Sequence, residues 1–393
     1  MIPYGRQNIN QEDIKAVTEV LKSDFLTQGP LVPQFEKKVA AYTGAKFGVA
    51  VNSATSALHI ACLALGIKKG DIVWTSPITF VASANCGVYC GASIDFVDIN
   101  KDTFNICVKK LEKKLIEAKK NKKLPKVVIP VHLAGQSCDM KRIKTLSKKY
   151  GFKILEDASH GIGGKYLNKP IGSCLYSDIT VFSFHPVKII TTAEGGMALT
   201  NKEELALSMA KYRSHGIVRT SQEMKKISDG PWYYEQVDLG FNYRMTDLYA
   251  ALGISQMNRL DNFVRKRHEI ANIYIEKLKK HKWISIPFQD KKTFSSFHLF
   301  IIRIIENKNN ISHKEVFEKL RNAGILVNLH YIPVYRHPFY AKMGYKKEDF
   351  PESESYYSQA ISIPIFPNMT KKQINEVIKI IETPFGSGYQ SLF

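Results

Sequence analysis

Short apolar runs rich in β-branched residues alternate with amphipathic stretches through the first half of the chain. The apolar runs predict buried strands at residues 48–51, 72–75, 94–98, 127–131, 153–155, 179–182 and 196–200. The stretches between them carry apolar residues at helical spacing, as at 57–65, 108–118, 140–150 and 202–213. Strands that alternate with helices form a mostly parallel, doubly wound sheet, so an α/β fold is expected.

The pattern changes in the second half of the chain. Residues 214–240 show no regular period and predict an irregular excursion. A long helix then begins near Thr246 or Asp247, either of which can cap it. From about residue 283 the pattern is α+β, with a strand at 297–302 followed by helices at 314–320 and 371–381.

The chain has 393 residues, which exceeds what a single hydrophobic core usually holds. We therefore expect a large domain (1–250), a connecting long helix (251–282) and a smaller C-terminal α+β domain (283–393). The tail after Pro384 is expected to be loosely ordered.

Composition excludes several classes of protein. No apolar stretch is long enough for a membrane helix, and the first seven residues do not resemble an export signal, so a cytoplasmic protein is expected. The six cysteines form no CxxC pair, which argues against a zinc site and favours buried thiols in a reducing compartment.

The formal net charge of +20 leaves two interpretations open. A basic protein can bind nucleic acid, but no basic stripe interleaved with aromatic residues is present. The densest cluster, at 119–123, is expected in a loop, and the other lysines are spread along helical segments. Lysine-rich solvated faces are the favoured interpretation, and a positive field would also attract an anionic substrate such as a nucleotide.

One lysine differs from the others in its surroundings. Lys188 lies on a short loop between two predicted buried strands, after Ser183 and before Gly196. Desolvation in such a place disfavours the ammonium and leaves a nucleophilic amine, which can form a Schiff base with a carbonyl cofactor. A purely structural lysine is the alternative.

Three other features describe the rest of such a cofactor. The turn Asn52–Ser56 lies between a strand and a helix, where free backbone N–H groups bind phosphate, although it could be an ordinary helix cap. Phe80 can stack on a flat heterocycle or belong to the core. Asp157, after Glu156 at a strand end, can keep a pyridine nitrogen protonated. Phosphate, ring face, ring nitrogen and aldehyde together indicate pyridoxal 5′-phosphate (PLP).

These residues also carry a resemblance to a known family. The segments 52–59 (NSATSALH), 156–160 (EDASH), 183–188 (SFHPVK), 193–196 (AEGG) and 241–244 (FNYR) are similar to those of the DegT/DnrJ/StrS sugar aminotransferases. The resemblance implies a PLP-dependent aminotransferase of fold type I, with a seven-stranded sheet in the large domain. It also implies a homodimer with active sites at the subunit interface. From composition and motifs, no nucleic acid or membrane partner is expected.

The resemblance assigns roles to individual residues. Lys188 and Asp157 would be catalytic, with Lys188 in the Schiff base and Asp157 on the ring nitrogen. The implied cofactor contacts are Lys188, Asp157, His160, Ala54, Thr55, Ser56, Phe80, Ser183, Asn242 and Arg244. Either Asn242 or Arg244 would come from the partner chain. The implied substrate contacts are Tyr4, Asp24, Phe25, Leu26, Thr27, His330 and Tyr331. His160 stands where many members carry glutamine, and the neighbouring His185 is expected to be structural.

Three stretches resemble family members of the pseudaminic acid pathway, at 159–161, 213–216 and 330–335. They imply transfer of an amino group from L-glutamate to the C4 ketone of a UDP-4-keto-6-deoxy-N-acetylhexosamine. Amination at C3, or of another UDP-, dTDP- or GDP-linked keto sugar, is the alternative. The dehydratase branch of the family has histidine in place of the lysine, so Lys188 argues against it. A regulatory protein that binds nucleic acid is a third hypothesis, prompted by the charge.

Overall fold

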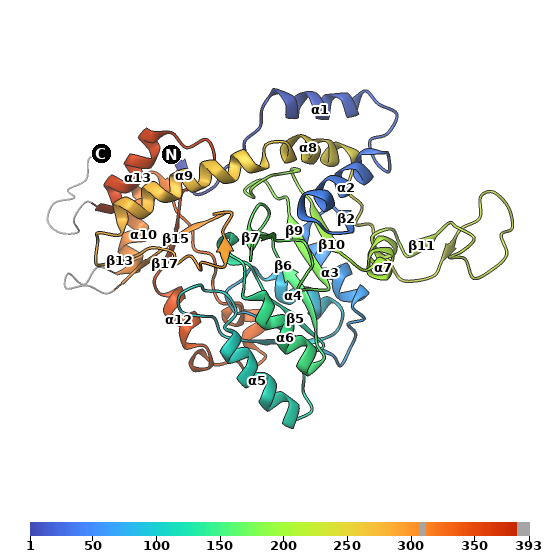
Figure 1. Cartoon of the computed structure of the whole chain (residues 1–393), viewed down its shortest axis with the longest axis horizontal. Coiled ribbons are helices and arrows are strands. Elements are labelled where there is room, and N and C mark those ends of the chain that lie inside the picture. Colours follow the sequence, from blue (N-terminus) through green and yellow to red (C-terminus); the bar gives the residue numbers. More distant parts are fainter. Residues whose placement is uncertain (306–311, 383–393) are drawn as a thin grey trace.

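The computed structural model describes residues 1–305 and 312–382 (Figure 1). Its central sheet has seven strands in the order β2-β10-β9-β6-β5-β3-β4. Only β10 runs antiparallel to its two neighbours; the remaining pairs are parallel. The strands are β2 (Phe47–Val51), β3 (Ile72–Thr75), β4 (Ser93–Phe96), β5 (Val127–Ile129), β6 (Lys153–Asp157), β9 (Ile179–Ser183) and β10 (Gly196–Thr200). The predicted seven-stranded, mostly parallel sheet is confirmed.

Both faces of this sheet are buried, because successive residues of each strand point to opposite sides. Val127 and Ile129 of β5 pack into the core formed with α3 (Ala54–Ala64), α4 (Ala82–Tyr89) and α7 (Glu203–Arg213). Val128, between them, packs into the core of α5 (Val108–Lys120) and α6 (Met140–Tyr150). On this second face, Phe182 of β9 meets α2 (Leu31–Thr43) and α8 (Asp247–Met257).

The C-terminal part is built on a second, antiparallel sheet of β13 (Ile284–Ser285), β15 (Phe300–Ile304) and β17 (Ala360–Ile363). It shares a core with α9 (Leu260–Leu278), α10 (His313–Asn322) and α13 (Lys371–Glu382). The chain start joins this part, since β1 (Ile2–Pro3) pairs with β16 (Ile325–Leu326). The α+β pattern expected there is present, whereas the exact domain boundaries stay predictions.

Smaller elements complete the described chain. They are α1 (Gln11–Leu21), β7 (Lys165–Tyr166), β8 (Lys169–Pro170), β11 (Ile217–Val218), β12 (Glu235–Gln236), β14 (Thr293–Phe294), α11 (Pro338–Ala341), α12 (Pro351–Tyr357) and 3-10 turns at Leu133–Gly135, Val334–Arg336 and Lys347–Asp349.

Several local expectations differ from the structure. The single long helix after residue 246 is two helices, α8 and α9, because Arg259 leaves helical backbone geometry at φ −111° and ψ 1°. Lys119 and Lys120 end helix α5 instead of lying in a loop. Residues 214–240 do form an excursion, which includes the β11–β12 pair and projects from the body of the molecule (Figure 1). The prediction for the tail lies outside the described residues.

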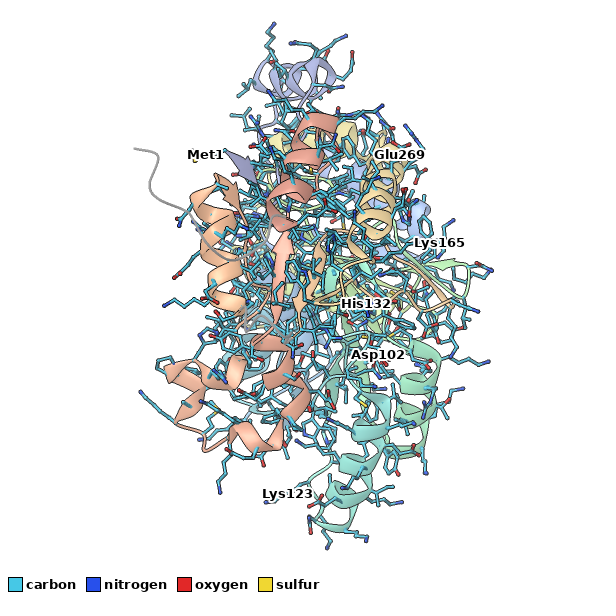
Figure 2. The ribbon with its side chains drawn as sticks, turned by 90° about the vertical axis from the view of Figure 1, so that its left-hand side faces the viewer. Met1, Asp102, Lys123, His132, Lys165 and Glu269 are labelled. Carbon is cyan, nitrogen blue, oxygen red and sulfur yellow. The ribbon has the colours of Figure 1, made fainter. Side chains whose placement is uncertain are left out.

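Charged side chains cover the outside of the molecule. Figure 2 shows Lys123, Lys165 and Glu269 on separate parts of the surface, whereas His132 is buried inside. In residues 1–305 and 312–382, no helix is long and apolar enough to cross a membrane.

Candidate active site

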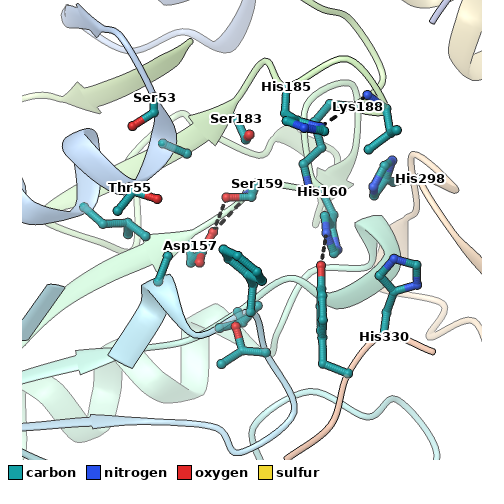
Figure 3. Close-up of a pocket in the computed structure, with 18 of the residues that line it drawn as sticks. Ser53, Thr55, Asp157, Ser159, His160, Ser183, His185, Lys188, His298 and His330 are labelled. Atoms are coloured by element: carbon teal, nitrogen blue, oxygen red, sulfur yellow. Dashed lines mark hydrogen bonds between the residues drawn. The ribbon is translucent and has the colours of Figure 1, made fainter. Parts of the chain in front are cut away.

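A cavity of about 460 Å³ opens where β6 and β9 end, between the two parts of the chain (Figure 3). Its walls bring together residues that are far apart in the sequence. The predicted site residues that line it are Tyr4, Ala54, Thr55, Phe80, Asp157, His160, Ser183, Lys188, His330 and Tyr331. His185, expected to be structural, also lies on this wall, and its Nε2 is 4.0 Å from a Glu194 carboxylate oxygen.

Other predicted contacts do not line this cavity. Ser56 is buried. Its hydroxyl donates to the Asn52 side chain at 2.7 Å, and its backbone N–H donates to the Ser53 hydroxyl, so both of its donors are already used within the turn. Phe25 lies on a separate cavity between α1, α2 and α8. The remaining predicted residues outside the wall are Asp24, Leu26, Thr27, Asn242 and Arg244. The structure does not test their predicted roles as cofactor and substrate contacts, which stay predictions.

The turn at residues 52–56, called the phosphate turn from here on, connects β2 to α3. Ser53 caps the helix with extended backbone, and its side chain accepts the Ser56 N–H. Gly196, at the start of β10, packs directly against this turn. A Cβ there would lie 2.5 Å from the Ser53 carbonyl oxygen and 2.6 Å from the Ala54 nitrogen. Only glycine lets β10 pack this closely against the phosphate turn. In this position the turn presents the first backbone N–H groups of α3 to the cavity.

Asp157 is held rigidly at the end of β6. The Ser83 hydroxyl, from α4, donates to one carboxylate oxygen at 2.6 Å. Ser159 donates to the other from both its backbone N–H and its hydroxyl, at 3.1 and 2.6 Å. The carboxylate is almost fully buried and lies on the cavity wall. A fixed carboxylate in this position can keep a heterocyclic nitrogen protonated.

The neighbouring acid, Glu156, points to the opposite face of the sheet, as strand geometry requires. His132 Nε2 lies 2.6 Å from one of its oxygens, and the Thr180 hydroxyl donates to the other. Burial raises the pKa of Glu156, but the contact with His132 outweighs it and holds the pKa below its ordinary value. Since His132 Nδ1 accepts the Cys138 N–H, its proton lies on Nε2. Of the two acids, therefore, only Asp157 faces the cavity.

Lys188 is half-buried on the same wall, between the buried residues Phe184 and Ile189. Burial lowers the pKa of its ammonium to about 8, and the Asp157 carboxylate partly opposes that shift. A lysine with such a pKa is a neutral amine far more often than a surface lysine at the same pH. This is the property that the sequence predicted for a Schiff-base lysine.

Three further histidines surround this lysine. The rings of His160 and His298 are tilted by 43° with their centroids 4.4 Å apart, and the His330 ring centroid lies 5.0 Å from that of Tyr4. Burial lowers the pKa of each, to about 3 for His330 and well below the ordinary value for the others. All three are therefore neutral at physiological pH. Neutral rings avoid charge repulsion with an ammonium and form a polar but uncharged wall.

Sequence reasoning missed His298, Ser83 and Ser159. Ser159 lies two residues after Asp157, so the short Asp-x-Ser spacing could have indicated it. No local signal marks Ser83 or His298, because both reach the site only through the packing of α4 and of the segment before β15. Figure 3 shows His298 and His330 facing His160 from the C-terminal part of the chain.

The cavity fits PLP by the chemistry of its donors. The phosphate turn offers N–H groups and hydroxyls, Asp157 a fixed carboxylate, and Lys188 an amine of lowered pKa. Phe80 is 57% exposed, which leaves its ring free to cover a flat heterocycle, and its centroid lies 6.1 Å from the Tyr331 ring. In residues 1–305 and 312–382, no cluster of three or more side chains could hold a metal ion.

Known proteins match this chain over nearly its whole length. The model of the DegT/DnrJ/EryC1/StrS aminotransferase family matches residues 7–382. A UDP-4-amino-4,6-dideoxy-N-acetyl-beta-L-altrosamine transaminase of Campylobacter jejuni subsp. jejuni is 41% identical over 373 residues, which cover 95% of this chain and 94% of that protein.

Solved structures agree with this match. Helicobacter pylori PseC, an aminotransferase involved in the biosynthesis of pseudoaminic acid, has a TM-score of 0.87 and 31% identity, covering 97% of this chain and 98% of that one. The PLP form of Streptococcus pneumoniae Spr1654 has a TM-score of 0.85 and 28% identity, covering 97% of both chains. The predictions of the fold, of PLP as cofactor and of sugar aminotransferase activity are confirmed.

Proposed function

This chain belongs to the DegT/DnrJ/EryC1/StrS aminotransferase family, and from that premise we propose that it moves an amino group from L-glutamate to the C4 ketone of a UDP-linked 4-keto-6-deoxy-N-acetylhexosamine. The single observation that carries the reaction is the pairing of Lys188 and Asp157 on one cavity wall, each in the environment its role needs. The choice of sugar is supported by the 41% identical relative, whose name specifies such a UDP-sugar.

Bound PLP supplies an aldehyde that receives the amino group and a ring that withdraws electrons from the reacting carbon. Lys188 has two tasks in the proposed reaction. Its neutral Nζ would hold the cofactor at the aldehyde, with loss of water, and once displaced by the substrate amine it would move a proton between the substrate carbon and the cofactor. A pKa of about 8 suits both directions of proton transfer near neutral pH.

Asp157 acts on the ring nitrogen in this proposal. Its two oxygens already accept hydrogen bonds from Ser83 and Ser159, which stabilise the ionised form and fix its direction. An ionised carboxylate keeps the ring nitrogen protonated, and a protonated ring withdraws electrons more strongly. We assign the phosphate to Ala54, Thr55 and Ser183, and the ring face to Phe80.

The sugar nucleotide enters from the other side of the cavity in our proposal. Tyr4, His330 and Tyr331 form an aromatic and polar wall there, with ring centroids 5.0 Å apart from His330 to each of the two tyrosines. Sugars bind such walls through ring stacking and hydroxyl hydrogen bonds. The loop of residues 24–27 would reach the nucleotide.

We also propose a homodimer, because the 214–240 excursion exposes large apolar side chains, and apolar side chains gathered on a surface usually mark a contact with another protein. Ile227 is 93% exposed, Leu239 75% and Trp232 74%. Asn242 and Arg244 follow this excursion directly, and their backbones bridge to Ser214 and Val51 of their own chain. In the proposed dimer, one of these two side chains would reach from there to the phosphate turn of the partner. The six cysteines are all free thiols, which fits the proposed cytoplasmic location.

The experiment is a substrate panel. Purified enzyme with PLP and L-glutamate is incubated with UDP- and dTDP-linked 4-keto-6-deoxy sugars and their 3-keto counterparts, and products are identified by mass and NMR. A 4-amino UDP-sugar together with stoichiometric 2-oxoglutarate is expected. A product aminated at C3, or only a dTDP-linked product, would favour the alternative substrate and contradict this one.

The matched control is Lys188→Ala, which should abolish turnover and the absorbance of the lysine-bound cofactor. A variant that retains this absorbance would remove Lys188 from the proposed role. A DNA shift assay at physiological salt tests the remaining alternative, and we expect no sequence-specific binding.

A further inference from the structure

Three of the six cysteines gather between α3 and α4, outside the active-site cavity. Cys62 lies on α3, Cys86 lies on α4, and Cys90 follows the last residue of α4. The first two are buried, whereas Cys90 is half-buried at the edge of the same core. The Cys62 thiol forms hydrogen bonds with the thiols of both other cysteines. In the described part of the chain no set of three or more such side chains could hold a metal ion, so this thiol cluster is not a metal site.

Cys90 has the surroundings of a reactive thiol. The hydrogen bond from Cys62 lowers its pKa, burial opposes this effect, and a hydrogen bond with His59 lowers the pKa further, from 9.0 to about 6. At pH 7 a pKa near 6 leaves about 90% of this sulfur as thiolate, against about 1% at the ordinary value. The thiolate is the form of cysteine that attacks electrophiles and peroxides.

Cys62 is better placed than Cys86 to react with an oxidised Cys90. Its thiol contacts the Cys90 sulfur across the interface of two helices. Cys86 lies one turn before Cys90 on the same helix, and its thiol donates to the Ser83 carbonyl at 3.4 Å. Residues four apart on a helix hold their Cβ atoms about 5–6 Å apart. A disulfide needs about 3.5–4.5 Å, so the pair within α4 is disfavoured.

We propose that Cys90 is a site of reversible oxidation by peroxides, and that the Cys62 thiol converts the oxidised sulfur into a disulfide that joins α3 to α4. The oxidant is hydrogen peroxide or an organic peroxide from the surroundings.

The chemistry balances in two steps. The Cys90 thiolate first attacks an oxygen of hydrogen peroxide, so that an S–O bond forms, the O–O bond breaks, and the departing hydroxide takes up a proton to become water. The sulfur is oxidised by two electrons to a sulfenic acid, and the peroxide is reduced. The Cys62 sulfur then attacks the Cys90 sulfur. The S–S bond forms, the S–O bond breaks, and the hydroxyl leaves as water with the proton of Cys62.

The disulfide would act on the helix that begins at the phosphate turn. Cys62 lies on α3, whose first N–H groups face the cavity. His59, also on α3, contacts Cys90, and its Nδ1 lies 3.2 Å from the Tyr243 hydroxyl. The Tyr243 carbonyl in turn accepts the N–H of Asn52 at 2.9 Å. Drawing Cys62 toward Cys90 should therefore shift the turn and weaken PLP binding. This consequence, unlike the oxidation itself, rests on the phosphate contacts proposed above.

The oxidation is tested on the PLP-loaded enzyme. The enzyme is treated with hydrogen peroxide, free thiols are blocked with N-ethylmaleimide, and the peptides are mapped by mass spectrometry. We expect a disulfide between Cys62 and Cys90 that dithiothreitol removes. Cys107 is the internal reference because it is also half-buried, and it should be oxidised at least about tenfold more slowly than Cys90. Equal rates at the two sites, or no oxidation of Cys90, would overturn the proposal.

The assigned partner is tested with two matched variants. In Cys62→Ala the second step cannot occur, so the sulfenic acid of Cys90 should accumulate and be trapped by dimedone. Cys86→Ala removes the other buried thiol of the cluster and should still form the disulfide. A disulfide between Cys86 and Cys90, or no dimedone adduct in Cys62→Ala, would contradict the assignment. If Cys62→Ala does not fold, the disulfide map of the native enzyme still identifies the partner.

The effect on the phosphate turn is measured by absorbance titration with PLP, before and after peroxide treatment. We expect oxidation to weaken PLP binding at least about threefold, with recovery in dithiothreitol. Cys90→Ser, treated in the same way, should show no change. Unaltered PLP affinity in an enzyme with a mapped disulfide would refute this effect, whereas the peptide map alone decides the oxidation site. No step uses a sugar, so failure of the substrate panel would leave both results readable.

Discussion

The lowered pKa of Lys188 makes a quantitative prediction about its reactivity. Burial lowers this pKa from 10.5 to about 8. At pH 7 the neutral amine is then about 9% of the population, against about 0.03% for a lysine of ordinary pKa. The amine form is thus enriched about 300-fold at neutral pH, and only this form attacks a carbonyl or another electrophile.

The assay labels the apo-enzyme with trinitrobenzenesulfonate, which reacts with neutral amines, at a series of pH values. Peptide mass spectrometry then quantifies labelling at Lys188 and at the exposed Lys123 in the same sample. Labelling of Lys188 should rise with pH and level off above pH 8, while Lys123 continues to gain reactivity at higher pH.

The perturbation is Asp157→Asn. The carboxylate of Asp157 opposes the effect of burial on Lys188, so its removal should lower the pKa of Lys188 further and move the midpoint to lower pH. A wild-type midpoint near 10, or a shift to higher pH in the variant, would refute the reasoning. Comparing midpoints rather than rates separates this electrostatic effect from any change in access to the cavity.

Three further outcomes follow from the structure. Lys188→Met should raise the free energy of unfolding of the apo-enzyme by about 1–3 kcal/mol below pH 8, as measured with denaturant. This advantage should disappear as the pH rises from 8 to 10.5, because the lysine is then neutral in the native state and still charged in the unfolded state. A difference that does not depend on pH would contradict this. Glu156→Leu leaves His132 and Thr180 without their buried partner and should lower the free energy of unfolding by about 2–5 kcal/mol. Glu156→Gln is the milder control, and a loss below about 1 kcal/mol in Glu156→Leu would argue against this reasoning. Gly196→Ala forces a Cβ to 2.5 Å from the phosphate turn and should weaken PLP binding at least about tenfold in an absorbance titration; unaltered affinity would show that the turn can shift.

Much of the large domain could be predicted from the sequence, because strand and helix periods are local properties. The strand at 196–200 coincides with β10, and the predicted strands at 48–51 and 179–182 each differ from the observed ones by a single residue. Lys188 and Asp157 were also identifiable, since Asp157 ends an apolar strand and Lys188 lies on the short loop between two others. A ligand site at such strand ends is a general property of α/β sheets.

The sequence did not decide how side chains far apart in the chain meet. Ser83 is 74 residues from Asp157, and Tyr331 is 171 residues from His160, so no spacing rule joins either pair. Position at a strand end applies equally to Glu156 and Asp157, and it was the resemblance to the family that pointed to Asp157 as the acid of the site. That choice depends on which face of β6 is turned to the cavity, which is set by its neighbours in the sheet.

The sequence by itself determined the order of strands and helices, the reactive lysine, and the chemical groups that a PLP site requires. The tertiary structure decided which of those groups share one cavity, how the lysine is desolvated, and that His160 and Tyr331 lie within hydrogen-bond distance of each other. The physical reason is that backbone periodicity acts over a few residues. Burial, pKa and proton position depend instead on packing between segments that the chain brings together only when it folds.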